Sequence, residues 1–390
     1  METTTLEHEL PVYARIGAEI VSGDGVMVET KDGQRWIDFY GGHAVALLGY
    51  RHPRLMAALR EQAERLFFQT NAVDVEVRQR AHTALAGLAP EGLDRVFLVN
   101  SGAEANENAL RIAFVQHPGR TQVVCLAGGF HGRTAAAGAV TAGALGRWYA
   151  FPRTPFDVVT IPVGDEAALR AAVGVQTAAV ILEPIQGIAG CVDLEPAYLR
   201  AVREVADATG ALFLADEVQC GMGRSGAAFA VQLAGVVPDL LTTAKGLAGG
   251  FPAGAVITTA QLASKLTIGS LGTTFGGGPM ACALIEAVAH ELTDTDLLAN
   301  VRARSEQLRA TCQVGPVVGV QGQGLLLGLR CNRPVAQILP ALRERGILAG
   351  GSSDPHVLRL TPPLILEACH VEALAAALSD LPEDPHAPMA

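Results

Sequence analysis

Lys245 and Asp216 are candidate catalytic side chains, and like Glu183 each comes within two residues of the end of a short apolar run. Lys245 is one of three lysines in 390 residues, and a glycine-rich stretch, Gly246 to Gly250, follows it. In an open parallel sheet, ligands bind beyond the carboxyl ends of the strands, so we expect the three side chains to converge there. An amine placed between two carboxylates can act as a nucleophile and move a proton.

Ser101, Gly102 and Ala103 open a segment with helical spacing, and backbone N–H groups at a helix start can bind a dianionic phosphate. Together with Lys245 and Asp216 they supply what pyridoxal 5′-phosphate (PLP) requires: an amine that forms an imine, a carboxylate that keeps the pyridine nitrogen protonated, and a phosphate cradle. We therefore expect PLP as the cofactor, with Lys245 also moving the substrate proton. Taken singly, Ser101 is an ordinary helix N-cap and Lys245 a surface lysine, so the prediction depends on the combination.

Phe130 lies between glycines in the run Gly128 to Arg133, which would let its ring approach a flat ligand, although a core phenylalanine fits the pattern equally well. The run Gly221 to Gly226 fits the GxGxxG pattern of dinucleotide-binding folds. Five residues, Asp216 to Cys220, separate that run from its strand, and no acidic residue ends a second strand about 20 residues further on. Nucleotide binding is therefore the weaker alternative.

The histidines indicate no metal site. His43, His52 and His131 have neither the i, i+4 helical pairing nor the cysteine partners that zinc sites favour. We assign His131 to loop structure and His52 to a turn. His43, which follows two glycines, is the histidine that could face a ligand.

Short β-branched runs alternate with Ala/Leu-rich stretches of helical period from about residue 94 onward. This alternation predicts an α/β fold with a mainly parallel sheet covered on both faces. The expected strands are Arg95 to Val99, Gln122 to Leu126, Ala178 to Leu182, Ala211 to Ala215, Leu240 to Thr243 and Ala255 to Thr258.

The two ends of the chain differ from this pattern. They contain an expected hairpin around residues 31–33, a long helix from about residue 285, and strands at Gly322 to Leu329 and Val357 to Leu360. We predict a large PLP-binding domain at residues 46–284. Residues 1–45 and 285–390 would together build a smaller α+β domain.

Composition limits the partners. The net charge of −10, without a local Lys/Arg run, argues against nucleic acid and anionic lipid. The first residues lack a basic segment followed by an apolar one, and charge, Pro or Gly interrupts every long apolar stretch, so we expect a cytoplasmic protein without membrane association. The seven scattered cysteines, with no CxxC pair, indicate reduced thiols.

Almost end to end, the chain resembles the class III, fold-type I PLP-dependent aminotransferases, and within them the acetylornithine/succinylornithine branch. The resemblance rests on segments that occur in the family's order: Asp38 to Val45 (DFYGGHAV), Asn100 to Leu110 (NSGAEANENAL), Phe130 to Thr134 (FHGRT), Glu183 to Gly187 (EPIQG), Leu214 to Gly226 (LADEVQCGMGRSG), Ala244 to Pro252 (AKGLAGGFP), Thr273 to Cys282 (TTFGGGPMAC) and Leu358 to Leu364 (LRLTPPL). It implies the large seven-stranded-type sheet of that fold and a homodimer.

The resemblance also implies roles for individual residues. Lys245 would form the imine, Asp216 would contact the pyridine nitrogen, and Gln219 would lie near the phenolic oxygen. Phe130 and Val218 would enclose the ring. Glu183 would support the residues that contact the cofactor without contacting the cofactor itself. Ser101, Gly102 and Ala103 would hold the phosphate, and Thr274 would reach the phosphate of the neighbouring subunit.

Substrate choice would rest on two arginines. The resemblance assigns the distal carboxylate to Arg133 and the carboxylate on the reacting carbon to Arg359, an arrangement that suits glutamate. Many relatives carry a glutamate that masks the second arginine at the position of Ile188. Succinylornithine-type members have an apolar residue there and share the run Tyr40 to Val45, which favours an N-acylornithine substrate.

The sequence therefore predicts an aminotransferase that moves the δ-amino group of N-acetyl- or N-succinylornithine to 2-oxoglutarate, in arginine biosynthesis. Two alternatives stay open. Another ω-amino or α-amino acid transaminase of the same fold would share these residues, and a PLP-fold binding protein without turnover would keep the cofactor contacts alone.

Overall fold

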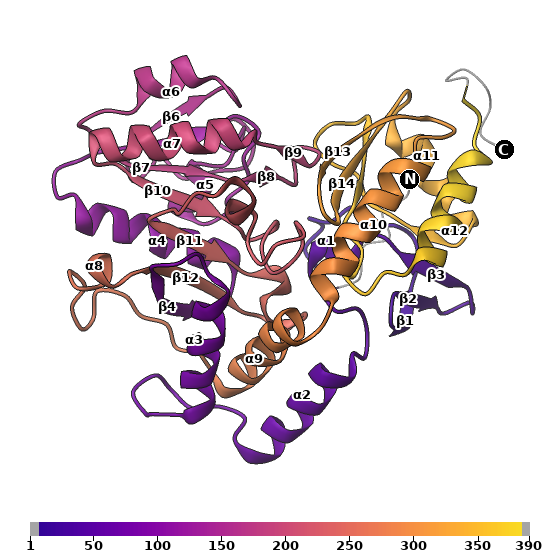
Figure 1. Ribbon diagram of the computed structural model, residues 1–390, viewed down its shortest axis with the longest axis horizontal. Helices are drawn as coiled ribbons and strands as arrows, with labels where there is room; N and C mark the ends of the chain where they lie inside the picture. The colour runs from indigo at the N-terminus through magenta and orange to yellow at the C-terminus, as the bar shows by residue number, and fades with distance from the viewer. Residues whose placement is uncertain (1–7, 384–390) are drawn as a thin grey trace.

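A seven-stranded sheet lies in the left half of the molecule in Figure 1, a computed structural model that describes residues 8–383. The strand order is β4-β12-β11-β10-β7-β5-β6. The strands are β4 (Leu93–Val99), β5 (Gln122–Leu126), β6 (Asp157–Ile161), β7 (Thr177–Leu182), β10 (Leu212–Asp216), β11 (Leu240–Thr243) and β12 (Gly254–Thr259). All neighbours are parallel except β12, which is antiparallel to β4 and β11, so the expected mainly parallel sheet is confirmed.

The sequence predicted all of these strands except β6. Its residues, Asp-Val-Val-Thr-Ile, lie at the edge of the sheet and are only partly buried, whereas every residue of β7 is buried. A short half-polar run gives a weak strand signal, because one face and one edge remain in contact with solvent.

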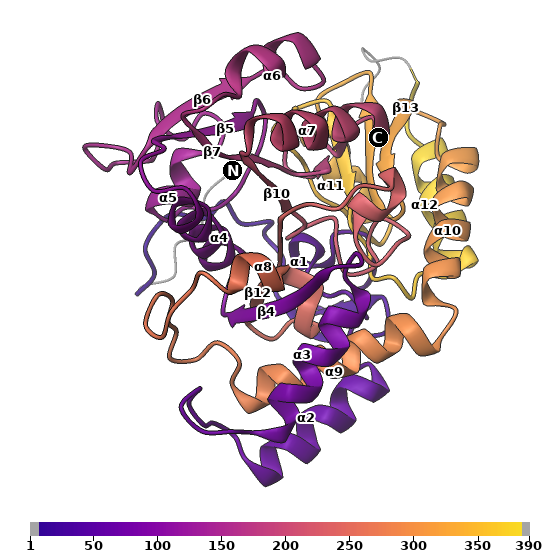
Figure 2. The same cartoon turned by 60° about the vertical axis from the view of Figure 1, so that its left-hand side comes forward.

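Helices cover both faces of the sheet. The helix α4 (Gly102–Gln116) packs on one face with α5 (Ala135–Ala139) and α8 (Ala260–Ala263). The other face carries α3 (Glu76–Leu88), α6 (Glu166–Ala172) and α7 (Pro196–Thr209), as Figure 2 shows for α6 and α7. The long helix α9 (Pro279–Asp294) packs against α3 and α2 (Pro53–Arg65). The parallel strands are thus buried on both sides.

The two ends of the chain meet in a second sheet of order β1-β2-β3-β15. Its strands are β1 (Ile20–Asp24), β2 (Met27–Thr30), β3 (Arg35–Asp38) and β15 (Ile347–Leu348). The β2–β3 pair is the hairpin expected around residues 31–33. This shared sheet fits a small domain made from both ends, although the expected domain boundaries stay a prediction.

The expectation of one strand from Gly322 to Leu329 was wrong. The structure has a hairpin there, β13 (Val317–Gln323) and β14 (Leu326–Cys331), and β16 (Val357–Leu360) pairs with β14. Gly324 turns the chain with φ of +57°, and a Cβ at that position would lie 2.4 Å from the carbonyl oxygen of Arg224. Only glycine fits this turn.

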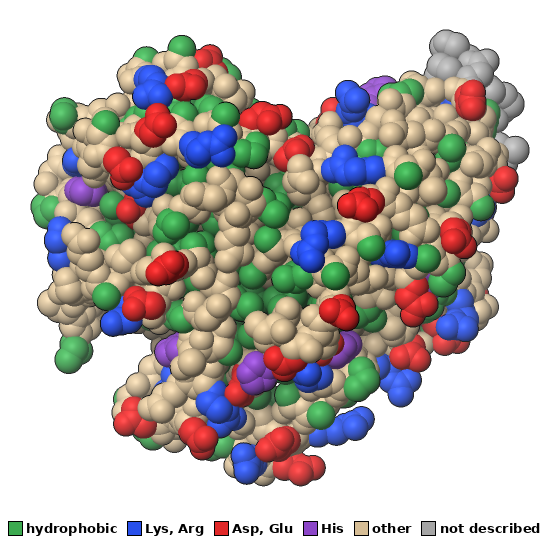
Figure 3. Space-filling view, in the orientation of Figure 1, with side chains coloured by type: hydrophobic (Ala, Val, Ile, Leu, Met, Phe, Trp, Pro, Cys, Tyr) green, Lys and Arg blue, Asp and Glu red, His purple; other side chains and the backbone are tan. Residues whose placement is uncertain are grey.

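Short and C-terminal elements complete the fold. They are α1 (Gly41–Ala44), β8 (Ile185–Gln186), β9 (Val192–Asp193), the 3₁₀ helices η1 (Ala230–Ala234) and η2 (Lys245–Ala248), and the helices α10 (Leu297–Thr311), α11 (Val335–Glu344) and α12 (Ala368–Ser379). On the face shown in Figure 3, acidic and basic side chains are interspersed. Among residues 8–383, no helix has both the length and the apolar character needed to cross a bilayer.

Candidate active site

A cavity of about 410 Å³ lies beyond the carboxyl ends of β4, β10 and β11. Most of the residues predicted from the sequence line it: Ser101, Gly102, Ala103, Phe130, Arg133, Asp216, Val218 and Lys245. The strands end here because polar residues replace the apolar run, and the shared sheet edge brings them together.

The start of α4 forms one end of the cavity. Ser101 is the N-cap, and its Oγ accepts a hydrogen bond of 3.1 Å from the backbone N–H of Glu104. The N–H of Ala105 donates to the carbonyl of Ser101 at 3.0 Å, whereas those of Gly102 and Ala103, in the first turn, have no acceptor within the helix and are available to an anion. A Cβ at Gly102 would lie 2.6 Å from Cγ1 of Val218, so only glycine lets the two segments approach this closely. The geometry suits a phosphate group.

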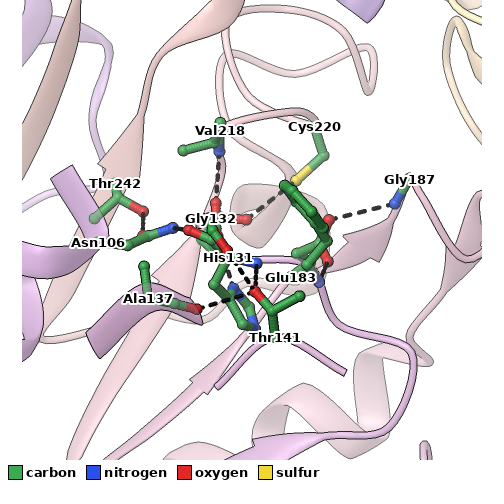
Figure 4. A network of polar contacts seen from close by, with 12 residues as sticks. Asn106, His131, Gly132, Ala137, Thr141, Glu183, Gly187, Val218, Cys220 and Thr242 are labelled. Atoms are coloured by element: carbon green, nitrogen blue, oxygen red, sulfur yellow. Dashed lines mark hydrogen bonds and ion pairs between the residues drawn. The ribbon is translucent and has the colours of Figure 1, made fainter. Parts of the chain in front are cut away.

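Asp216, the last residue of β10, is buried and lines the cavity within a polar network, whose members Asn106, His131, Val218 and Thr242 are labelled in Figure 4. Its Oδ2 lies 2.7 Å from Nδ1 of His131 and accepts a 2.7 Å hydrogen bond from Nδ2 of Asn106. Its Oδ1 accepts from the backbone N–H of Val218 at 3.0 Å. Thr242 orients Asn106 by donating to its Oδ1 at 2.6 Å. Asp216 is therefore held in one orientation, with its charge directed at the cavity.

His131 lies in a loop, as expected, but the sequence did not predict that its ring is buried against Asp216 and that it lines the cavity. Burial alone would lower its pKa, but the hydrogen bond and charge of Asp216, together with Glu183, raise the pKa above its ordinary value. The sequence also missed Asn106. The available signal was a polar residue on the buried side of α4, where Ala105 and Ala109 are its neighbours.

Lys245 follows β11 with a left-handed φ of +43°, which is rare for a residue with a Cβ. Burial lowers the pKa of its amine, and the charges of Asp216 and Glu183 partly oppose that shift. A lowered pKa increases the fraction of neutral, nucleophilic amine. The strained backbone and the buried amine are both typical of a reactive lysine.

Glu183 fixes the loop that carries Phe130 and Arg133. Its carboxylate accepts from the backbone N–H of Phe130 at 2.8 Å and of Gly187 at 3.4 Å. Burial, followed by the charge of Asp216, raises the pKa of Glu183 to about 7. Glu183 does not line the cavity, so it acts on the site through this loop.

Arg133 reaches the cavity from the exposed side. Its guanidinium carbon lies 5.7 Å from the ring centroid of Phe130 and 5.5 Å from that of Trp148. Sequence reasoning did not find Trp148, because the contact joins two loop positions with no common pattern. Two aromatic faces stabilise the cation without neutralising it.

The structure does not place the other predicted site residues on the cavity wall. Arg359 and Gln219 are buried, and Nη1 of Arg359 lies 3.4 Å from Oε1 of Gln219. Nη2 of Arg359 lies 3.2 Å from Nδ1 of His43, which covers it from the solvent side. Thr274 is exposed on the surface of the single chain. The nucleotide alternative finds no support, since the run Gly221 to Gly226 is a buried turn.

The residues present fit PLP. The cavity combines a buried carboxylate fixed by three contacts, a buried amine with a lowered pKa, and the free N–H groups at the start of α4. Phe130 and Val218 line the wall between them and offer apolar surfaces to a flat ring. These are the contacts that a pyridine nitrogen, an aldehyde carbon, a phosphate and a ring require.

Comparison with known proteins agrees with this geometry. Residues 12–381 match the family Aminotransferase class-III. The acetylornithine aminotransferase of Brucella melitensis is 39% identical over 376 residues, which is 93% of this chain and 92% of that protein. The acetylornithine aminotransferase of Streptomyces coelicolor is 43% identical over 365 residues, covering 92% and 89%. The ornithine aminotransferase structure of Toxoplasma gondii ME49 superposes with a TM-score of 0.89 at 30% identity, covering 95% of this chain and 91% of that one. The chain therefore belongs to the class III aminotransferases, has their fold-type I architecture and is a PLP-dependent enzyme.

Proposed function

We propose that the protein moves the δ-amino group of N-acetylornithine or N-succinylornithine to 2-oxoglutarate, giving the N-acyl glutamate semialdehyde and glutamate. One observation carries the proposal: Arg133 lines the cavity, Arg359 lies behind it against Gln219, and neither forms an ion pair with an acidic side chain of residues 8–383. Each can therefore bind a substrate carboxylate. The names of the Brucella and Streptomyces relatives support the acylornithine.

Lys245 would hold the cofactor covalently through Nζ, and Asp216 would hold the proton on its pyridine nitrogen. When bound, PLP supplies an electron-accepting ring that stabilises the negative charge formed at the substrate carbon. The lowered pKa of Lys245 suits an Nζ that, once the substrate amine has taken its place on the cofactor, would accept a proton from that carbon and give it up again. The contacts of Asp216 with His131 and Asn106 keep its charge in place throughout.

The two arginines would divide the substrates between them. The α-carboxylate of an acylornithine lies one bond farther from the reacting carbon than the distal carboxylate of glutamate does, so Arg133 can bind both. The guanidinium of Arg133 lies over two aromatic rings and has no hydrogen bond to the part of the chain that the structure describes, which suits such a shift. Arg359 would bind the carboxylate on the reacting carbon, which glutamate and 2-oxoglutarate carry and an acylornithine lacks.

The remaining predicted contacts belong to the same proposal. Phe130 and Val218 would enclose the ring, and Gln219 would lie near the phenolic oxygen. The phosphate would bind to Ser101, Gly102 and Ala103, where the N–H groups of the helix are free.

We propose that the enzyme is a cytoplasmic homodimer of arginine biosynthesis, with Thr274 of one subunit at the phosphate of the other. An apolar cavity of about 480 Å³ beside this segment supports a second subunit there. It is lined in part by Phe67 and Phe275, whose side chains are 66% and 67% exposed in the single chain. Large exposed aromatic residues around a hollow are typical of an interface.

An amino-donor screen tests the reaction. PLP-loaded enzyme is mixed with N-acetylornithine, N-succinylornithine, ornithine, 4-aminobutyrate and glutamate, and the cofactor absorbance is followed. We expect rapid change with glutamate and with one N-acylornithine, and glutamate formation when 2-oxoglutarate is added. A faster reaction with ornithine or 4-aminobutyrate would support the alternative ω-amino transaminase. No change with any donor would support a non-catalytic PLP-binding protein.

Chemical labelling tests the lysine. Borohydride treatment of the PLP-loaded enzyme should attach the cofactor to Lys245, and Lys245→Ala should abolish both labelling and turnover. The two other lysines, Lys31 and Lys265, are internal controls, and labelling at either would contradict the assignment.

Subunit mixing tests the shared site. Lys245→Ala and Thr274→Ala proteins should each have low activity, and mixed dimers should recover part of it, because one of their two sites regains both groups. An active monomer in sedimentation experiments would contradict the proposal.

A further inference from the structure

Arg359 is a buried cation whose side-chain hydrogen-bond partners among residues 8–383 are neutral groups. It is 2% exposed, and its Nη1 and Nη2 point to Oε1 of Gln219 and Nδ1 of His43, at 3.4 and 3.2 Å. Its Nε has no hydrogen-bond partner among residues 8–383. A buried charge of this kind depends on its hydrogen-bond acceptors for stabilisation. The neutral residue that accepts from Arg359 therefore affects how readily the guanidinium can bind a substrate.

His43 is aimed at Arg359 by an unusual backbone. The four residues Gly41 to Ala44 all have positive φ, at +54°, +54°, +63° and +69°, and form a left-handed turn. Two of them, His43 and Ala44, carry a Cβ, for which this conformation is unfavourable. Strain of this kind persists where the surrounding structure imposes it and is enriched at functional sites.

The surroundings do impose it. Oδ1 of Asp38 accepts from the backbone N–H groups of Tyr40 and Gly41, both at 2.8 Å. Thr361, two residues after Arg359, donates from Oγ1 to the carbonyl of Tyr40 at 2.6 Å. The turn is therefore attached to the end of β16, the strand that carries Arg359.

The imidazole is neutral in this position. Desolvation and the positive charges of Arg359, Lys245 and Arg133 lower the pKa of His43 to about 4. Its Nε2 contacts the hydroxyl of Tyr40, so Nδ1 is free to accept the hydrogen bond from Arg359. His43 is itself exposed, whereas Arg359 behind it is buried.

We propose that His43 is a specificity-determining positioning residue: it masks Arg359 with a neutral acceptor that a substrate carboxylate displaces and an ω-amine leaves in place. The inference rests on the proposed function, because it concerns an enzyme that alternates between a donor without a carboxylate on the reacting carbon and an acceptor with one. Gln219 supplies the second acceptor.

A neutral mask explains how one site serves both substrates. While an acylornithine reacts, Arg359 keeps its hydrogen bond and its charge stays away from the reacting carbon. When glutamate or 2-oxoglutarate enters, its carboxylate forms a charge-assisted, bidentate pair with the guanidinium, which is stronger than the hydrogen bond to a neutral imidazole. A carboxylate in the place of His43 would form an ion pair with Arg359, and the substrate carboxylate would have to break that ion pair in order to bind.

The test compares single-turnover kcat/KM for glutamate and for N-acetylornithine in three variants. His43→Leu removes the acceptor, so the ratio of the glutamate value to the N-acetylornithine value should rise about tenfold, as expected for loss of one hydrogen bond to a charged group. His43→Asn tolerates positive φ and keeps an acceptor near the place of Nδ1, so its ratio should stay within about twofold of wild type. Ala44→Gly relieves strain in the same turn without contacting Arg359, and its ratio should not change.

An unchanged or lowered ratio in His43→Leu would overturn the proposal, as would an equal rise in His43→Asn. Nitrogen NMR of the imidazoles gives a readout that needs no turnover: a signal missing from the His43→Asn protein identifies His43, and it should show unprotonated Nδ1 and protonated Nε2 at neutral pH. The opposite tautomer would contradict the hydrogen bond. If the wild type reacts with no ω-amine at all, the proposed function fails while the NMR result still decides whether His43 accepts from Arg359.

Discussion

Arg133 and Arg359 present the same functional group in two different environments. Arg133 is exposed on a loop, and its guanidinium lies over the rings of Phe130 and Trp148. Arg359 is buried on β16, and its guanidinium faces Gln219 and a neutral histidine. An aromatic face tolerates sliding and rotation of the cation, whereas a hydrogen bond has one direction. Under the proposed division of substrates, this difference would make the carboxylate contact of Arg133 adaptable and that of Arg359 selective.

Removing each guanidinium should give the largest effects and tests the comparison directly. Arg133→Ala should reduce single-turnover kcat/KM by about 100-fold or more with both glutamate and N-acetylornithine, because each loses a charge-assisted carboxylate contact. Arg359→Ala should cause a similar loss with glutamate and a much smaller one with N-acetylornithine. Equal losses with both donors in Arg359→Ala would show that the arginines do not divide the substrates.

A carboxylate introduced near Arg359 should have a smaller effect on kcat/KM, and one that is confined to glutamate. Residue 188 lies against the loop between β15 and β16, because its carbonyl accepts from the backbone N–H of Ser353 at 2.8 Å. Ile188→Glu should place a carboxylate that competes for Arg359, lowering kcat/KM for glutamate roughly tenfold and sparing N-acetylornithine. Ile188→Gln is the matched control for size. If Gln and Glu act alike, the effect is steric.

The aromatic support of Arg133 should matter less. Trp148→Leu should raise KM about two- to fivefold for both substrates, since a cation–π contact at an exposed site contributes about 0.5–1 kcal/mol. Trp148→Phe should retain part of the contact. Because Trp36 is the only other tryptophan, fluorescence of a Trp36→Phe protein reports on Trp148 and should change when a dicarboxylate such as glutarate binds. Unchanged fluorescence at saturating glutarate would show that Trp148 does not report on carboxylate binding.

The smallest effect should appear in the pH dependence of stability. The folded-state pKa of His43, about 4, is below the ordinary 6.5, so protonation favours the unfolded chain. Stability from this group is complete above pH 6.5 and is lost as the pH falls toward 4. The melting temperature of the wild type should therefore fall more than that of His43→Asn between pH 7 and pH 5. Parallel curves would show that His43 titrates normally.

The sequence was sufficient to predict that Asp216 and Lys245 line one cavity. Asp216 and Lys245 follow buried strands, and strand ends at one sheet edge must meet, so their convergence could be predicted without any long-range information. The helix start at Ser101 could be predicted in the same way from its capping residues. Both predictions use local sequence patterns, and the first also uses the rule that ligands bind at the carboxyl ends of parallel strands.

The contacts that His43 and His131 make could not be predicted in this way. The contact between His43 and Arg359 spans 316 residues, and it depends on a left-handed turn that two glycines permit but do not dictate. The contact between Asp216 and His131 is similar, since no spacing rule relates a loop histidine to a strand end 85 residues later. Tertiary packing determines such pairs, and a local sequence motif does not say which distant residue its members contact.

The pairing of β3 with β15 has a consequence for how the chain is made. Ile37 lies opposite Ile347, so 347 − 37 = 310 residues must be synthesised before this edge of the sheet can close. At roughly 5–20 residues per second, the hairpin of β2 and β3 leaves the ribosome about 15–60 s before its partner. During that interval it presents an open strand edge, which is prone to pairing with other chains. The left-handed turn that holds His43 follows β3 directly, so the contact between His43 and Arg359 forms only after nearly the whole polypeptide has emerged.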